Sequence, residues 1–175
     1  MSLKSFIAES NRIEGITREP LDSEVREHVC LLEAPNLDIS VVSRFQAVIS
    51  PFRPLRSRPG MNVYVGDHLP PLGGKAVVKK LQGLLKSFSE NAQPARILHC
   101  HFETLHPFMD GNGRTGRALW LWQIHHFDSS DEILNGDETF LSIWCKGKTI
   151  IPEDDDNFFV KRHMYYYDLS SFRWR

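Results

Sequence analysis

One segment of this chain constrains the fold more than any other, because it is apolar on nearly every side when it is read as a helix. It runs from Gly113 to Phe127 and contains the run Ala118-Leu-Trp-Leu-Trp122. A surface helix keeps polar residues on one side, so a helix that is apolar all round has to be buried. We therefore expect residues 113–127 to form the central helix of the fold.

Further helices are expected where apolar residues recur at the i, i+3, i+4 spacing and where proline or glycine punctuates the chain. The clearest of them spans Gly74 to Phe88. The helix expected at residues 22–34 has Val25, Val29 and Leu32 at helical spacing. The other expected helices are Ser2–Ile13, Asp38–Ile49 and Ala95–Leu105, with two short ones near 138–146 and 154–170.

The segment from Ser50 to Gly74 is rich in proline, arginine and glycine. Its residues Arg53, Arg56 and Arg58 are expected either in a solvated loop or as charges that steer an acidic target. Residues 62–66, Asn-Val-Tyr-Val-Gly, indicate a short strand with a turn and so one small hairpin. The predicted fold class is all-α with a small β-hairpin, and 175 residues are enough for one domain with a core.

The composition argues against several classes of protein. The chain is 25% charged with a formal net charge of -1, so it lacks the basic excess that nucleic-acid binding proteins show. No apolar run reaches the roughly 20 residues of a membrane span, and the first residues are too polar for a secretory signal. The cysteines Cys30, Cys100 and Cys145 lack CxxC spacing and suit a reducing cytoplasm. We expect a cytoplasmic protein that binds neither nucleic acid nor membrane.

Residues that can carry chemistry are concentrated in His106-Pro-Phe-Met-Asp110-Gly-Asn-Gly-Arg114-Thr-Gly-Arg117, where a glycine-containing loop leads into the central helix. Glycine lets backbone N–H groups approach a ligand closely, and a helix N-terminus is a site for anions. Arg114 and Arg117 suit phosphate oxygens, and Asp110 offers the hard oxygen ligand that Mg²⁺ prefers. His106 ends the preceding helix, where it could take a proton from a hydroxyl group. This set of residues indicates phosphoryl or nucleotidyl transfer.

The same segment matches the Fic family signature, H-x-F-x-[DE]-G-N-G-R-x-x-R, at every fixed position, and so resembles the active-site motif of that family. The resemblance implies a single Fic domain over residues 1–175, with an inhibitory helix (1–17), a core (18–127) and C-terminal helices (128–175). It also implies an enzyme that moves AMP from Mg·ATP to a Ser, Thr or Tyr hydroxyl of a target protein. The Doc branch, which phosphorylates, has a lysine where this chain has Gly113.

The resemblance implies a role for each part of the motif. His106 would be the general base, and Asp110 would hold Mg²⁺ or Mn²⁺. Phe108 would pin the loop into the core. The phosphates of ATP would be held by Asn112 and the N–H groups around Gly111 and Gly113, by Arg114 and by Arg117. The hairpin, or flap, would pair with an extended segment of the target by strand addition; its residues are Asn62, Val63, Tyr64, Val65 and Gly66.

A second match lies near the start of the chain, in Ser10-Asn-Arg-Ile-Glu14-Gly15. It fits the inhibitory pattern of the family, [ST]-x-x-x-E-[GN]. The resemblance implies an autoinhibited enzyme in which Glu14 pairs with Arg117 and occupies the space that the γ-phosphate needs. ATP could then bind, but with its α-phosphate misaligned for attack.

Several alternatives stay open at the level of sequence. The same site could remove AMP from a target, or transfer another phosphate-linked group such as UMP or phosphocholine. The chain could also be a catalytically silent binding module with a Fic fold, but such a module is expected to lack His106, Asp110 or a motif arginine, and all are present. An oligomer is compatible with the sequence.

Overall fold

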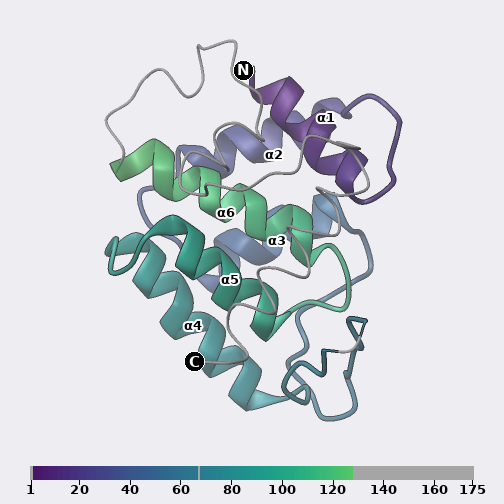
Figure 1. Cartoon of the computed structure of the whole chain (residues 1–175), viewed down its shortest axis with the longest axis vertical. Helices are drawn as coiled ribbons and strands as arrows, with labels where there is room; N and C mark the ends of the chain where they lie inside the picture. Colours follow the sequence, from purple (N-terminus) through teal and green to yellow (C-terminus); the bar gives the residue numbers. More distant parts are fainter. Residues whose placement is uncertain (1, 67, 128–175) are drawn as a thin grey trace, which may run out of the picture. The chain divides into compact units, whose positions relative to one another are not determined.

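The computed structural model describes residues 2–66 and 68–127, and within these ranges the chain is built from helices (Figure 1). Every helix expected in these ranges is present, with ends that differ by no more than two residues. The helices expected near 138–146 and 154–170 lie outside the described residues. The observed helices are α1 (Leu3–Ile13), α2 (Asp22–Leu32), α3 (Ile39–Ile49), α4 (Lys75–Ser89), α5 (Ala95–Leu105) and α6 (Asn112–Phe127).

The described residues from 26 to 127 form one compact unit, and α6 is its central helix. This helix packs against α5, and also against α3 and α4. Leu119 and Trp122 are fully buried, and Trp122 Nε1 donates a hydrogen bond to Ala34 O at 2.9 Å, which satisfies the polar edge of the ring. The prediction of a buried central helix is therefore confirmed. Both ends of the loop at 106–111 are thus fixed to packed helices, α5 and α6.

A second compact unit contains α1 and the first residues of α2. The carboxylate of Glu24 connects its parts, because it accepts hydrogen bonds from both terminal nitrogens of Arg18 at 2.8 Å, from Leu21 N at 2.8 Å and from Asn11 Nδ2 at 3.4 Å. Glu24 is buried, and a buried carboxylate is tolerated only with partners of this kind. The start of α2 therefore holds α1 and the loop that follows it.

Of the three apolar residues at helical spacing in α2, Leu32 is buried and Val25 is half-buried. Val29 is exposed, and the buried positions are Glu24, His28, Leu31 and Leu32. These positions keep helical spacing, but they are rotated from the apolar stripe because two polar residues find partners inside the fold. The ring of His28 packs edge-on against Phe45 with centroids 4.7 Å apart.

The strand expected at Asn62–Val65 is absent from the described residues. A single antiparallel bridge joins Val65 and His68, with N–H···O distances of 3.1 and 2.9 Å. A two-stranded element of this size has little stability of its own, because no third strand or sheet face supports it. The flap as a hairpin, and the division into residues 1–17, 18–127 and 128–175, stay predictions.

None of the described helices combines the length and the apolar character that crossing a membrane would require.

Candidate active site

The loop that carries the predicted active-site residues begins where α5 ends. His106 is the C-terminal cap residue of α5, and its backbone is left-handed, with φ 47° and ψ 61°. Pro107 follows and has no N–H with which to continue the helix. Residues other than glycine seldom adopt this conformation, and here it turns the chain sharply out of α5. The side chain of His106, half-buried, lies at this turn.

A reciprocal pair of hydrogen bonds between Phe108 and Asn112 sets the shape of the loop. Asn112 Oδ1 accepts from Phe108 N, and Asn112 Nδ2 donates to Phe108 O, both at 2.9 Å. The ring of Phe108 is buried near Phe102, with centroids 6.5 Å apart, which confirms that Phe108 anchors the loop in the core. Asn112 therefore shapes the loop, and the phosphate-binding role predicted for it stays a prediction.

The position of Gly111 between this loop and α6 requires glycine. Its φ is +75°, and a Cβ atom there would lie 2.7 Å from Ser50 Cβ. Gly111 O accepts the hydrogen bond from Thr115 N at 3.0 Å that opens α6. The loop backbone therefore passes close to the end of α3 at the point where the helix N-terminus is formed.

Asp110 is exposed and is held by residues at the end of α3. Ser50 Oγ donates to Asp110 Oδ2 at 2.8 Å, and Gln46 Nε2 donates to the backbone oxygen of Asp110 at 2.7 Å. Partial desolvation of the carboxylate raises the pKa of Asp110, but hydrogen bonds from Ser50 and from Gly111 N–H, with the charges of Arg114 and Arg53, outweigh it and leave the pKa below its ordinary value. The carboxylate is therefore charged at neutral pH.

Both motif arginines lie in the first turns of α6 and are buried, Arg114 at 8% exposure and Arg117 at 4%. Between them lies Gly116, where a Cβ atom would collide with Glu103 Oε1 and approach His99 Nδ1 to 3.0 Å. Gly116 therefore lets α6 approach α5 closely. In the sequence it occupies one of the variable positions of the motif, so only the packing shows why it is small.

Comparison with known proteins agrees with the motif. The sequence model of the Fic/DOC family matches residues 49–124. Residues 49–124 belong to the Fic/DOC family. A protein of Drosophila willistoni named "Protein adenylyltransferase Fic" is 41% identical over 63 residues, which cover 33% of this chain and 13% of the fly protein. The protein of the same name from Drosophila mojavensis is 38% identical over 63 residues and is covered to 12%. The matched segment thus spans a small part of these relatives.

Within this Fic domain, a strand-like segment before the flap runs antiparallel to the loop at 106–111. Leu55 and Phe108 form a bridge, Arg56 N donates to Pro107 O at 2.8 Å, and Met109 N donates to Pro54 O at 3.1 Å. The expectation that Arg56 lies in a solvated loop or steers a target is wrong, since its side chain is fully buried. Arg53 and Arg58 are exposed.

The flap residues are placed beside α5. His68 Nε2 lies 2.9 Å from Thr104 O, which fixes the base of the flap to the last turn of α5. Exposure alternates along residues 62–65, with Tyr64 80% exposed and Val65 buried. Most of the large hydrophobic residues that the described ranges expose lie in or near this segment: Phe52, Tyr64, Leu69 and Leu72.

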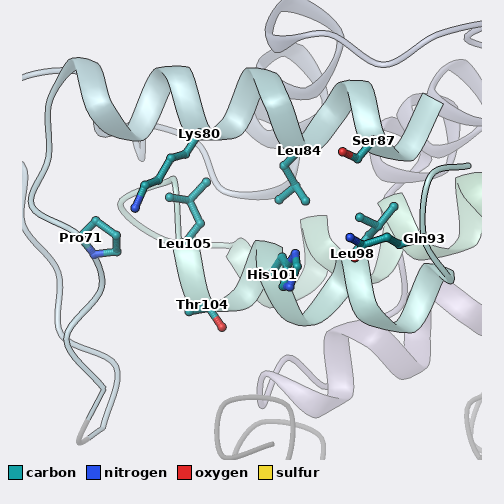
Figure 2. Close-up of a pocket in the computed structure, with 9 residues that line it drawn as sticks. All are labelled: Pro71, Lys80, Leu84, Ser87, Gln93, Leu98, His101, Thr104 and Leu105. Carbon is teal, nitrogen blue, oxygen red and sulfur yellow. The ribbon is translucent and has the colours of Figure 1, made fainter. Parts of the chain in front are cut away.

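A pocket of about 330 Å³ lies between α4 and α5, beside Pro71 (Figure 2). Lys80 and Leu84 line it from α4, and Leu98 and His101 line it from α5. Burial lowers the pKa of His101, so its ring is neutral at pH 7. The described residues that line this pocket include none from His106–Arg117. We therefore treat it as separate from the Fic motif.

The N-terminal motif lies at the end of α1. Ser10 is buried within the helix, Glu14 is the exposed C-terminal cap residue, and Gly15 follows with φ 77°. A glycine in this conformation is a common way to end a helix. The pairing of Glu14 with Arg117 stays a prediction.

Proposed function

We propose that this chain is a protein adenylyltransferase that transfers the AMP part of ATP to a hydroxyl group of a target protein. The observation that carries the proposal is the loop between α5 and α6, which presents a histidine, a charged carboxylate and a helix N-terminus within a few residues of one another. The match of residues 49–124 to the Fic/DOC family supports the same reaction class. The fly relatives carry that activity in their names, although the matched segment covers little of their length.

In the proposed step, His106 takes the proton from the target hydroxyl. The hydroxyl oxygen forms a bond to the α-phosphorus of ATP, the bond from that phosphorus to the bridging oxygen breaks, and pyrophosphate leaves. A positioned general base of this kind contributes roughly 10²–10⁴-fold to the rate. The left-handed turn at His106 supports the role, because it places the residue on the loop rather than inside the regular helix.

The residues around α6 suit the phosphates of ATP. The first N–H groups of a helix lack helical partners, and the helix dipole adds a partial positive charge at the same end. Gly111 and Gly113 carry no side chain that would cover these N–H groups, and Arg114 and Arg117 add two cationic groups on the first turns. We propose that this end of α6 holds the phosphate chain.

Asp110 fits a magnesium ion. Its carboxylate is exposed and charged, and Ser50 Oγ donates a hydrogen bond to one of its two oxygens. Among the described residues no group of three or more His, Cys, Asp or Glu side chains could hold a metal. Mg²⁺ in nucleotide enzymes commonly takes one or two carboxylates together with phosphate oxygens. When bound, the ion would neutralise charge on the phosphates.

We propose that the target docks along the flap. In this proposal, residues 62–65 accept a target segment as an added strand, which would fix its register through main-chain hydrogen bonds. Phe52, Tyr64, Leu69 and Leu72 lie in or near the flap in sequence and expose large apolar side chains that a docked protein would cover.

We further propose that the enzyme is autoinhibited by the N-terminal motif, with Glu14 competing for Arg117. This proposal rests on the sequence match of Ser10–Gly15 and on the position of Glu14 as an exposed cap residue of α1. Release of Glu14 would leave the arginine for the γ-phosphate.

The proposed reaction is tested by labelling. Full-length protein, with and without Glu14→Gly, is incubated with Mg²⁺, cell lysate and ATP labelled either on the α- or on the γ-phosphate. We expect protein-bound label from α-labelled ATP alone, loss of labelling in EDTA, and a drop of about 10²–10⁴-fold in His106→Ala with ATP binding kept. His125→Ala, an exposed histidine at the far end of α6, is the matched control. Near wild-type labelling by His106→Ala would contradict the assignment, and label from γ-labelled ATP would indicate phosphorylation.

A further inference from the structure

The side chain of Arg56 is fully buried, and its hydrogen bonds reach the start of the loop at 106–111, here called the catalytic loop, and the residues on either side of the flap. Its guanidinium donates hydrogen bonds in two directions, toward the end of α5 and toward the segment that precedes α4. A buried arginine is unusual because removing a charge from water is costly. Its contacts therefore indicate what the buried position does.

Toward α5, Arg56 Nε donates to His106 O at 2.7 Å and Nη2 donates to Leu105 O at 2.8 Å. These carbonyls lie in the last turn of the helix, where no further turn supplies N–H donors. Met109 N, which would meet Leu105 O in a continued helix, instead donates to Pro54 O at 3.1 Å. The guanidinium therefore replaces the missing backbone donors at the two carbonyls that flank His106.

Toward the flap, Arg56 Nη1 donates to Pro71 O at 2.7 Å and to Met61 O at 3.4 Å. Met61 and Pro71 lie on either side of the flap residues in sequence. The backbone of Arg56 contributes as well, since Arg56 O accepts from Gly74 N at 2.9 Å and closes the segment 56–74 into a loop whose ends meet. One side chain thus joins the two ends of the flap to the catalytic loop.

The four acceptors of Arg56 are main-chain carbonyls, and none is a carboxylate. Burial lowers the pKa of Arg56, but arginine stays protonated in proteins. A charge held in this way gains no ion pair, and apolar side chains of the same volume would leave these carbonyls without their donors. What they could not supply is the planar fork of donors that fixes several backbone oxygens at once.

We propose that Arg56 is a positioning residue for the transfer reaction. Its hydrogen bonds connect the backbone of His106 to the flap, so that the general base and the docked target hydroxyl keep a fixed position relative to each other. The inference rests on the proposed function. A general base works within about 2.6–3.2 Å of the proton that it takes. A displacement of about 1 Å can cost about 10²-fold in rate, even when it originates away from the reacting atoms.

The test uses full-length protein, with and without Glu14→Gly, in which Arg56 is replaced by lysine or by glutamine. Neither replacement can reproduce the fork that reaches Leu105, His106 and Pro71 together. We expect kcat for target labelling to fall about 10- to 100-fold while the Kd for ATP stays within about twofold. Arg58→Gln, the same substitution at an exposed arginine two residues away, should leave both values unchanged.

A double-mutant comparison separates positioning from a general effect on the fold. If Arg56 acts through His106, Arg56→Lys should add little to the loss in a His106→Ala protein, whereas a structural defect would lower the residual labelling further. Circular dichroism and thermal unfolding check that each variant is folded.

The outcomes distinguish this inference from the proposed function. Wild-type kcat in folded Arg56→Lys and Arg56→Gln would overturn the positioning role while the proposed reaction stands. A loss that merely follows weaker ATP binding would overturn it too, as would failure of both variants to fold. If neither wild type nor Glu14→Gly transfers label from α-labelled ATP, the proposed function is lost and the inference with it.

Discussion

At the scale of single residues, the fold requires glycine at position 111 but not at position 83. Gly111 has φ +75°, and an added Cβ would lie 2.7 Å from Ser50 Cβ, so an alanine there meets both backbone strain and a collision with the end of α3. Gly83 lies in α4, and an added Cβ would have no atom within 4 Å. The first glycine is required by the path of the loop at 106–111, and the second is a weak point of a regular helix.

We predict that the two alanine substitutions change the free energy of unfolding in opposite directions. Gly83→Ala should stabilise the protein by about 0.5–1 kcal/mol, because glycine loses more freedom than alanine on entering a helix. Gly111→Ala should destabilise it by more than about 1 kcal/mol. Urea unfolding curves of the two variants and the wild type measure both effects. A stabilised Gly111→Ala variant would contradict the required left-handed turn.

The residues of the motif could be predicted from the sequence because they lie within one short segment, whereas their supporting residues could not. Ser50 and Gln46 hold Asp110 from 60 and 64 residues away, and neither carries a local pattern that indicates this contact. Arg56 lies in a proline- and glycine-rich stretch that is typical of solvated loops, so its burial follows only from the packing of that stretch on α5.

At the scale of elements, the flap segment makes a sharper test possible than the sequence alone allowed. Val65 N already donates to His68 O, so proline at 65 would damage the turn itself. Val63 has no such bridge among the described backbone hydrogen bonds, and its neighbour Tyr64 is 80% exposed. The N–H of Val63 is therefore the better candidate for pairing with a target strand.

We predict that Val63→Pro abolishes labelling of the target but leaves the affinity for ATP within about twofold of wild type, since proline removes one ladder donor from an added strand. Val63→Ala trims the side chain, keeps the N–H and should retain most of the labelling. Calorimetry with ATP and a labelling assay on the same preparations measure both quantities. Equal labelling by the proline variant would place target docking elsewhere on the domain.

The hydrogen bonds of Glu24, which connect α2 to α1 and to the loop between them, can be tested through the pH dependence of the free energy of unfolding. Burial raises the pKa of Glu24, but the hydrogen bonds from Arg18 and Leu21 N–H outweigh it, and the pKa lies below its ordinary value of 4.5. A pKa that is lower in the folded state stabilises the fold above the unfolded pKa, and this stabilisation is lost as the pH falls through the folded pKa.

We therefore predict that Glu24→Gln lowers the free energy of unfolding at pH 7 by about 1.5–3 kcal/mol. The difference from wild type should shrink as the pH is lowered from about 5 towards 3, because the wild-type carboxylate then takes up a proton. Glu27→Gln, whose partner Arg44 is 55% exposed, should cost at most about 1 kcal/mol at any pH. Urea unfolding at several pH values decides, and a pH-independent difference for Glu24→Gln would contradict the assigned charge.

At the scale of the whole molecule, the two sequence motifs fall in different compact units. Ser10–Gly15 belongs to the unit that contains α1, and His106–Arg117 belongs to the unit built around α6. The proposed autoinhibition is therefore a hypothesis about how two separately packed parts of one chain act on each other. Such a link can be tested without knowing the target, because labelling of the protein by itself reports on the competent state.

We predict that Glu14→Gly raises self-labelling and target labelling at least about tenfold. A hydrogen bond between charged groups contributes roughly 1.5–3 kcal/mol, which corresponds to about 10- to 150-fold in the competent population. Glu14 is the exposed cap residue of α1, so the substitution should cost about 1 kcal/mol or less in stability.

Two further variants make this prediction specific to the proposed pair. Glu19→Gly removes another exposed carboxylate from the same unit, one that lies 3.6 Å from Lys4, and it should leave labelling unchanged. Arg117→Ala added to Glu14→Gly should cancel the gain, because the arginine that Glu14 is proposed to withhold from ATP is then absent. If folded Glu14→Gly labels itself and lysate no faster than wild type, or if Glu19→Gly gives the same increase, Ser10–Gly15 does not restrain the active site through this glutamate.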